Sequence, residues 1–208
     1  DHPPIIALLI RAGYFIFHNE LGVRLFIVLM STASLIIIYD LIPCKNKKLF
    51  IAIACSMGVL QIGGMIAVPD IPLIFFTALF FWLYRRFLQN DSLSNSLLLG
   101  LGMSLMLYSK YHGVLIILFT LLSNLKLLKQ PKAYVAVLAA FVLFVPHLLW
   151  QYRHHFPSVQ YHLFERSSSG YKFSFTTDYI LGQLLLARPV MGWLLLWQSF
   201  GYKAKNVF

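Results

Sequence analysis

Hydrophobic and polar positions divide the chain into long apolar runs separated by short polar connectors. The runs cover residues 24–42, 49–68, 72–88, 96–109, 112–125, 133–150 and 179–200. A membrane-spanning helix needs about 20 apolar residues. The pattern therefore predicts an all-α fold, a polytopic transmembrane helical bundle of about seven spans, in which the whole chain, residues 1–208, forms a single transmembrane region.

A shorter apolar stretch covers residues 5–17 and carries Arg11. It is too short to span a bilayer comfortably, and the two prolines ahead of it favour the first turn of a helix. We expect this stretch to form a helix that lies in the membrane interface. Its polar end would then hold Asp1 and His2 at the membrane surface.

The composition agrees with a membrane protein, because 59% of the residues are hydrophobic and only 12% are charged, against about 25% charged in soluble domains. Basic clusters follow the first, third, fifth and last runs, so they share one face, which the positive-inside rule makes cytoplasmic. The clusters are Lys45, Lys47 and Lys48; Arg85 and Arg86; Lys126, Lys129 and Lys132; and Lys203 and Lys205. The net charge of +10 thus reflects topology and does not indicate a nucleic-acid partner, because no basic polar segment is interleaved with aromatic residues.

Almost all candidate chemistry falls on the opposite, non-cytoplasmic face. That face receives Asp1, His2, Glu20, Asp70, Lys110, His112 and the long loop 151–178. The convergence favours a functional site, while the alternative is that polar residues simply flank helix ends.

Asp70 lies between two prolines in the sequence Val-Pro-Asp-Ile-Pro-Leu. Prolines remove backbone donors and fix the turn, which would hold the carboxylate rigidly at the mouth of the bundle. A carboxylate near the hydrocarbon boundary is a functional candidate, and it is also a good helix N-cap; both roles can hold together. Lys110, in Tyr-Ser-Lys-Tyr-His-Gly, either pairs with a phosphate or extends to the lipid headgroups.

The first four residues, Asp-His-Pro-Pro, form a second rigid turn that bears an acid. Asp1 with His2 could ligate a divalent cation or contact a phosphate, and a helix cap is the alternative. The loop 151–178 carries His154, His155 and His162, which either supply a metal or phosphate ligand or belong to an aromatic interfacial belt.

The sequence contains no glycine-rich phosphate loop and no zinc-protease motif, so nucleotide-dependent chemistry is not expected. The pairs Gly63-Gly64 and Gly100-x-Gly102 lie inside apolar runs. There we expect them to permit close packing of helices.

Four motifs occur in a characteristic order. They are Asp1-His2-Pro3-Pro4, Glu20-Leu21-Gly22-Val23-Arg24-Leu25, Pro69-Asp70-Ile71-Pro72-Leu73 and Ser109-Lys110-Tyr111-His112-Gly113-Val114. In this combination the chain resembles the bacterial membrane glycosyltransferases of the dolichyl-phosphate-mannose-protein mannosyltransferase-like family, which includes the lipid A aminoarabinose transferase. The resemblance covers nearly the whole chain. It implies a partial fold of the GT-C type in the bacterial inner membrane, with the active face periplasmic or extracellular.

The resemblance also implies an activity and its partners. Such enzymes transfer a sugar from a polyprenyl-phosphate donor, usually with inversion, to a hydroxyl of a lipid, protein or glycan, and they use no nucleotide cofactor. By position, Asp70 matches the family's second acidic motif, Asp1 the acid before the paired prolines, and Lys110 the lysine proposed to meet the donor phosphate; His2 occupies a position that is often basic. In some members the acid at the position of Asp1 helps hold a divalent metal with a histidine of the following large loop, for which His155 is one candidate.

The family's principal acid lies upstream of the paired prolines, in a loop after a first span. We therefore expect this chain to be a fragment that lacks the first span, the first acidic loop and the C-terminal part, and to be inactive alone. The alternative function is a transporter or flippase of a lipid-linked anion, which needs polar or broken helices near the membrane midplane. A non-catalytic scaffold, as a third reading, would tolerate neutralisation of Asp70.

Overall fold

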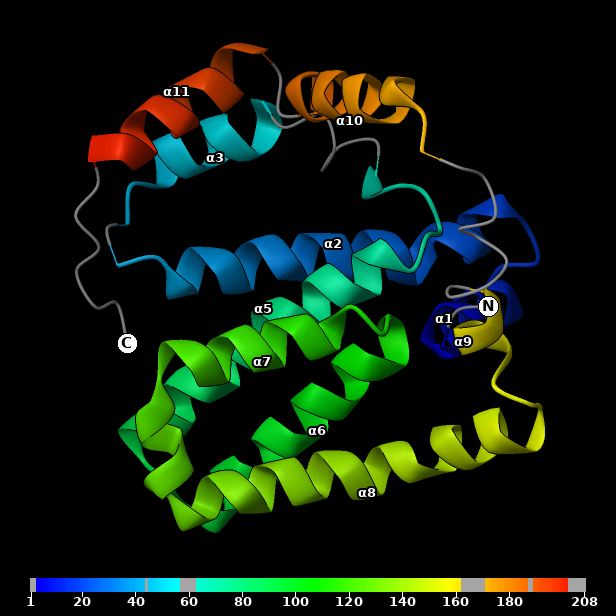
Figure 1. Cartoon of the computed structure of the whole chain (residues 1–208). Helices are drawn as coiled ribbons and strands as arrows, with labels where there is room; N and C mark the ends of the chain where they lie inside the picture. Colours follow the sequence, from blue (N-terminus) through cyan, green and yellow to red (C-terminus); the bar gives the residue numbers. More distant parts are fainter. Residues whose placement is uncertain (1–2, 44, 57–62, 162–170, 187–188, 202–208) are drawn as a thin grey trace.

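The computed structural model describes residues 3–43, 45–56, 63–161, 171–186 and 189–201, and these residues form helices, turns and connectors without a β-strand. Figure 1 shows them as a bundle in which the longest helices run roughly side by side. The helices are α1 (Ile5–Ile16), α2 (Glu20–Leu41), α3 (Lys47–Ser56), α5 (Asp70–Gln89), α6 (Leu93–Ser109), α7 (Gly113–Ser123), the 3-10 helix η1 (Leu125–Lys129), α8 (Pro131–Arg153), α9 (Pro157–Gln160), α10 (Phe173–Leu186) and α11 (Pro189–Gly201).

The predicted all-α membrane bundle is confirmed. Within the described residues three helices, α2, α5 and α8, are long and apolar enough to cross a membrane, and α1, α6 and α7 are shorter apolar helices. Polar residues set two of the starts: the Asn19 side chain accepts hydrogen bonds from the first N–H groups of α2, and Ser92 does the same for α6. Within the run 49–68, helix α3 is described through Ser56 and residues 57–62 lie outside the described residues, so a span there stays a prediction.

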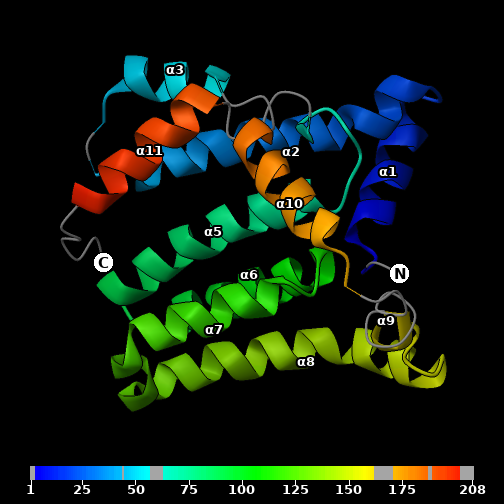
Figure 2. The ribbon, with the colours of Figure 1, turned by 45° about the horizontal axis from the view of Figure 1, so that its top comes forward.

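Helix α1 lies across one end of the bundle (Figure 2), which agrees with the interfacial helix expected at this position. Its approach to α2 is close. A Cβ atom on Gly13 would lie 2.1 Å from the Gly22 carbonyl oxygen, and a Cβ on Gly22 would lie 2.0 Å from the Phe17 carbonyl oxygen. Glycine at both positions is therefore what permits the tight turn between the two helices.

The core lies between α5 and α6, with α8 packed on α6. Helix α5 presents Phe76, Phe80, Tyr84 and Phe87 to this core at helical spacing. Small residues allow α6 and α8 to approach: a Cβ on Gly100 would lie 2.5 Å from the backbone oxygen of Ala136. The expected packing role is thus confirmed for Gly100, whereas a Cβ on Gly63 would meet nothing within 4 Å, so close packing does not explain that glycine.

Two boundaries differ from the sequence-based expectation. The run 179–200 is not one described helix but parts of two, α10 and α11, because proline opens α11 and favours a first-turn position. The predicted loop 151–178 is partly helical, because α8 extends through Arg153, α9 forms at 157–160, and α10 begins at Phe173.

Successive long helices run in opposite directions, so their connectors lie in turn at two opposite ends of the bundle. We call the end that holds Lys45, Arg85 and Lys132 the basic end, and there Arg85 and Lys45 pair with Asp40 and Lys132 pairs with Asp91. The other end, called the site end, is where α2, α5 and α7 begin and α6 and α8 finish (Figures 1 and 2). The antiparallel course of these helices therefore brings their polar connectors together, as the charge pattern predicts.

Candidate active site

Asp70 and Lys110 meet at the site end, although they are far apart in the sequence. Pro69 is the N-cap of α5 and Asp70 its first residue, while Lys110 is the C-cap of α6. The Lys110 Nζ donates to the Asp70 Oδ1 at 2.7 Å, with 22% of the lysine side chain and 55% of the aspartate side chain exposed. Asp70 is therefore not the N-cap itself; it lies in the first turn, where its partly exposed carboxylate pairs with a cation.

A second polar cluster, built around Tyr111, lies beside this pair. The Tyr111 hydroxyl shares a hydrogen bond with His147 Nε2 at 2.7 Å and accepts one from Gln151 Nε2. Gln151 Nε2 also donates to Ser158 Oγ at 2.8 Å. His147, Gln151 and Ser158 are all buried, so one buried polar cluster next to Lys110 joins the connector between α6 and α7 to α8 and α9.

The sequence analysis did not single out His147, Gln151 or Ser158. A signal was present for His147, because it is an ionisable residue inside the apolar run 133–150, and such residues are functional candidates by default. Gln151 follows one helical turn later, on the same face of α8. The Gln151 Oε1 is buried and has no partner among the described residues.

A cavity of about 360 Å³ opens next to this cluster, lined by Pro4, Tyr108, Pro146, His147 and Trp150. Its walls are mostly aromatic: the Trp150 ring stacks on His147 at a centroid distance of 6.0 Å, and Tyr108 contacts His147 edge-on at 5.6 Å. Such a lining, aromatic with few polar groups, is typical of small-molecule sites. The cavity borders Pro4, the last residue of the Asp-His-Pro-Pro motif.

The other predicted site residues are placed as follows. Asp1, His2 and His162 lie outside the described residues. Glu20 pairs with Arg24 on the surface of α2 at 3.7 Å, and His112 precedes α7 without a capping side-chain hydrogen bond. His155 is exposed in the turn between α8 and α9, with a positive φ of 60°. Within the described residues, neither Glu20, His112 nor His155 joins the Asp70–Lys110 pair.

The described residues alone do not form a metal site, because they contain no group of three or more His, Cys, Asp or Glu side chains suited to hold a metal ion. The metal ligands expected from the sequence are Asp1, outside the description, and His155. A metal therefore stays a prediction, and no step of the chemistry below is assigned to it.

A protein-family model described as dolichyl-phosphate-mannose-protein mannosyltransferase matches residues 1–150. The chain belongs to this mannosyltransferase family. The match begins ahead of α1 and continues into α8, so it covers Asp70, Lys110, Tyr111 and His147. Membership makes the chain a membrane glycosyltransferase of a family that uses polyprenyl-phosphate sugar donors. A search of the curated proteins and a search of the solved structures each returned no match.

Proposed function

We propose that this mannosyltransferase-family chain contributes the active site for transfer of a sugar from a polyprenyl-phosphate donor to a hydroxyl of a lipid, protein or glycan. The reaction takes place at the periplasmic or extracellular face of the bacterial inner membrane, at the site end of the bundle. The observation that carries the proposal is the Asp70–Lys110 pair, 2.7 Å apart, because it joins a carboxylate and an ammonium of complementary use in this reaction.

The transfer breaks the bond between the sugar C1 and the phosphate oxygen, and the electron pair leaves on that oxygen. The acceptor hydroxyl oxygen forms the new bond to C1 from the opposite face, which inverts the configuration. Asp70 orients the hydroxyl and takes its proton, and Lys110 stabilises the negative charge on the departing polyprenyl phosphate. In the resting pair the two charges satisfy each other, and the donor phosphate competes for Lys110 and releases the Asp70 carboxylate for the acceptor.

The aromatic cavity beside the Tyr111 cluster is proposed to receive the sugar. Tyr108, His147 and Trp150 provide flat apolar faces, and the Tyr111 cluster fixes the helix ends that carry them. Asp1 and His2, which precede Pro3, are proposed as the second acid and a second phosphate cation. If a divalent metal binds, Asp1 and His155 are its proposed ligands, and it would add positive charge near the phosphate.

The charges of the described spans support a transferase more than a transporter. In α2, α5 and α8 the Asp, Glu, Lys and Arg side chains all lie within six residues of a helix end. A transporter of a lipid-linked anion would need polar or broken helices near the midplane.

The decisive experiment compares two aspartates that each pair with a lysine. The protein that carries this chain is reconstituted in proteoliposomes with polyprenyl-phosphate sugars and a crude acceptor mixture, and transfer is measured for wild type, Asp70→Asn and Asp91→Asn. Asp91 pairs with Lys132 at 3.3 Å at the basic end and is exposed to a similar degree, 57% against 55%. We expect Asp70→Asn to lose at least about a hundredfold in rate and Asp91→Asn to keep its rate. Equal rates in all three proteins would reduce Asp70 to a structural residue, and movement of the lipid-linked donor without transfer would favour the transporter.

A further inference from the structure

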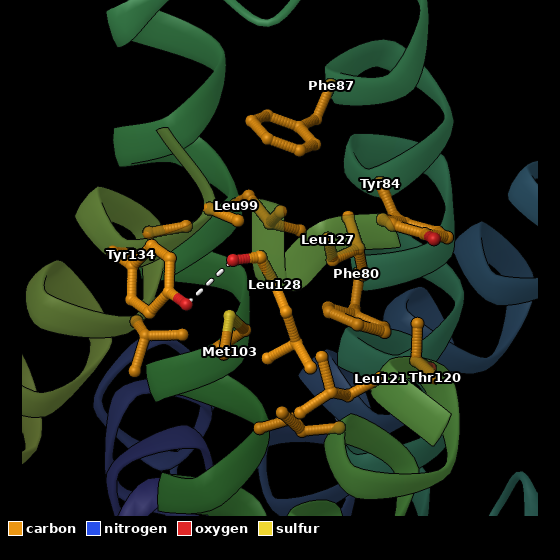
Figure 3. A pocket seen from close by; sticks show the side chains of 14 residues that line it. Phe80, Tyr84, Phe87, Leu99, Met103, Thr120, Leu121, Leu127, Leu128 and Tyr134 are labelled. Carbon is orange, nitrogen blue, oxygen red and sulfur yellow. Dashed lines mark hydrogen bonds between the residues drawn. The ribbon is translucent and has the colours of Figure 1, made fainter. Parts of the chain in front are cut away.

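A second cavity lies in the half of the bundle toward the basic end, away from Asp70. It has a volume of about 270 Å³ and is enclosed by α5, α6, α7, η1 and α8 (Figure 3). Its floor consists of buried side chains such as Phe80, Phe87 and Met103, whereas the rim residues Leu128, Tyr134 and Val137 are about half exposed. The cavity therefore opens between η1 and α8, toward the surroundings of the bundle.

The polar atoms that line the cavity are engaged with the protein. The Thr120 hydroxyl donates to the Ile116 carbonyl, Tyr84 accepts from Asn124 Nδ2 at 2.9 Å, and Tyr134 donates to the Leu128 carbonyl at 2.8 Å. A cavity lined by carbon, with its hydroxyls bonded elsewhere, has little to offer water; even an engineered apolar cavity of about 150 Å³ stays dry and accepts hydrocarbon. The chemistry of this cavity thus selects a hydrocarbon chain.

Two lysines of η1 are direct neighbours in the sequence of residues that line the cavity. Leu127 and Leu128 line the cavity, and Lys126 and Lys129 flank this pair in η1. In a 3-10 helix residues three apart lie on the same side, so the two ammonium groups are presented together, and both residues are exposed. Within the described part of the chain no carboxylate lies within ion-pair distance of either lysine.

We propose that this cavity is a binding site for an anionic phospholipid of the leaflet at the basic end. One acyl chain enters between η1 and α8 and rests on the aromatic floor, and the phosphate of the headgroup contacts Lys126 and Lys129. The Tyr134–Leu128 hydrogen bond joins the two sides of the mouth and opens or shifts to admit the chain. The site is separate from the proposed sugar-transfer site, which lies at the opposite end of the same helices.

The test measures lipid retention by native mass spectrometry of the purified protein. Phosphatidylglycerol and phosphatidylcholine with identical acyl chains serve as probes. The charge variant is Lys126→Gln with Lys129→Gln, and its control is Lys47→Gln with Lys48→Gln, two exposed lysines on α3 toward the same end. The cavity variant is Val137→Trp, which fills the mouth, and its control is Leu122→Trp on the exposed surface of α7 outside the cavity.

Wild type and both controls should retain phosphatidylglycerol in preference to phosphatidylcholine. The charge variant should lose about tenfold or more of that preference, since each lysine near a membrane surface contributes roughly a fivefold preference for anionic lipid, and Val137→Trp should lose retention of both lipids. Thermal melting of each variant confirms that it is folded. Retention without headgroup preference, or retention that neither variant changes, would overturn the proposal; in the second case the lipid binds elsewhere or another protein segment occupies the cavity.

Discussion

At the scale of single residues, the negative charge of Asp70 is stabilised by a helix N-terminus and by a lysine, and the side chain itself is not buried. It begins α5, where the peptide dipoles favour a negative charge, and its partner Lys110 comes from the end of α6. Ion pairs as exposed as this one contribute only about 0–1 kcal/mol to folding. The pair is thus better suited to function than to stability, and mutation of either member should change activity with little change in melting temperature.

Lys110→Met removes the cation and keeps most of the length of the side chain. We expect the KM for the polyprenyl-phosphate donor to rise about tenfold or more and kcat to fall, because the ammonium contacts the phosphate both when the donor binds and as negative charge develops on its leaving oxygen. The measurement is sugar transfer in proteoliposomes over a range of donor concentrations. Lys132→Met is the control, because Lys132 forms a comparable pair with Asp91 at the other end. Identical KM values for the two variants would remove Lys110 from the donor site.

Tyr111→Phe tests the buried polar cluster. Loss of the hydroxyl leaves His147 Nε2 without its partner and removes one of the two acceptors of Gln151 Nε2. Buried groups left unsatisfied cost about 1–3 kcal/mol. Thermal unfolding in detergent should show a loss of that size for Tyr111→Phe and none for Tyr152→Phe, since Tyr152 is exposed on the same end of α8. A Tyr111→Phe protein as stable as wild type would mean that the cluster does not hold α8 and α9 to the connector between α6 and α7.

The sequence was enough to find Asp70 and Lys110, because each stands in a short polar motif between apolar runs. The topology predicted only that both lie at the same end of the bundle, and the structure shows that they form an ion pair. The Tyr111 cluster could not be found in this way, because its members come from a connector and two helices, and Gln151 and Ser158 are ordinary polar residues when read singly. Which side chains meet inside a bundle depends on helix rotation and packing, and hydropathy does not specify either.

At the scale of helices, the apolar runs predicted α2, α5, α6, α7 and α8 to within a few residues. The run 179–200 was less informative, because the proline that begins α11 interrupts an otherwise uniform apolar stretch. The sequence also predicted close helix packing only in part. Gly100 and Gly63 both lie inside apolar runs, yet Gly100 faces α8 whereas nothing lies within 4 Å of a Cβ on Gly63.

Gly100→Ala tests the contact between α6 and α8. The added methyl group would lie 2.5 Å from the Ala136 oxygen and 2.8 Å from the Ala139 Cβ, so the helices must separate. We expect a destabilisation of about 1–3 kcal/mol, the usual range for overpacking. Gly182→Ala in α10 is the matched control, because nothing lies within 4 Å of its added methyl and alanine favours helix over glycine by about 0.5–1 kcal/mol. Chemical unfolding that ranks Gly100→Ala at or above wild type would contradict the packing described for α6 and α8.

At the scale of the whole molecule, the bundle has two charged ends of different composition. The basic end holds Lys45, Arg85 and Lys132, which pair with Asp40 and Asp91, and the site end holds the Asp70–Lys110 pair. The proposed chemistry requires the site end to face away from the cytoplasm, where it would meet the sugar carried by the lipid donor. The lipid-binding cavity proposed above requires the opposite end to face the anionic cytoplasmic leaflet.

Both requirements can be tested at once by single cysteines in a protein whose native Cys44 and Cys55 are replaced by serine. Glu20 and His112 are exposed at the site end, and Asn90 is exposed in the connector between α5 and α6 at the basic end. In intact cells a membrane-impermeant thiol reagent should label Glu20→Cys and His112→Cys but should reach Asn90→Cys only after permeabilisation, because the positive-inside rule holds the basic end in the cytoplasm. The reverse pattern would place Asp70 and Lys110 on the cytoplasmic side and overturn both the proposed face of sugar transfer and the proposed leaflet of the bound phospholipid.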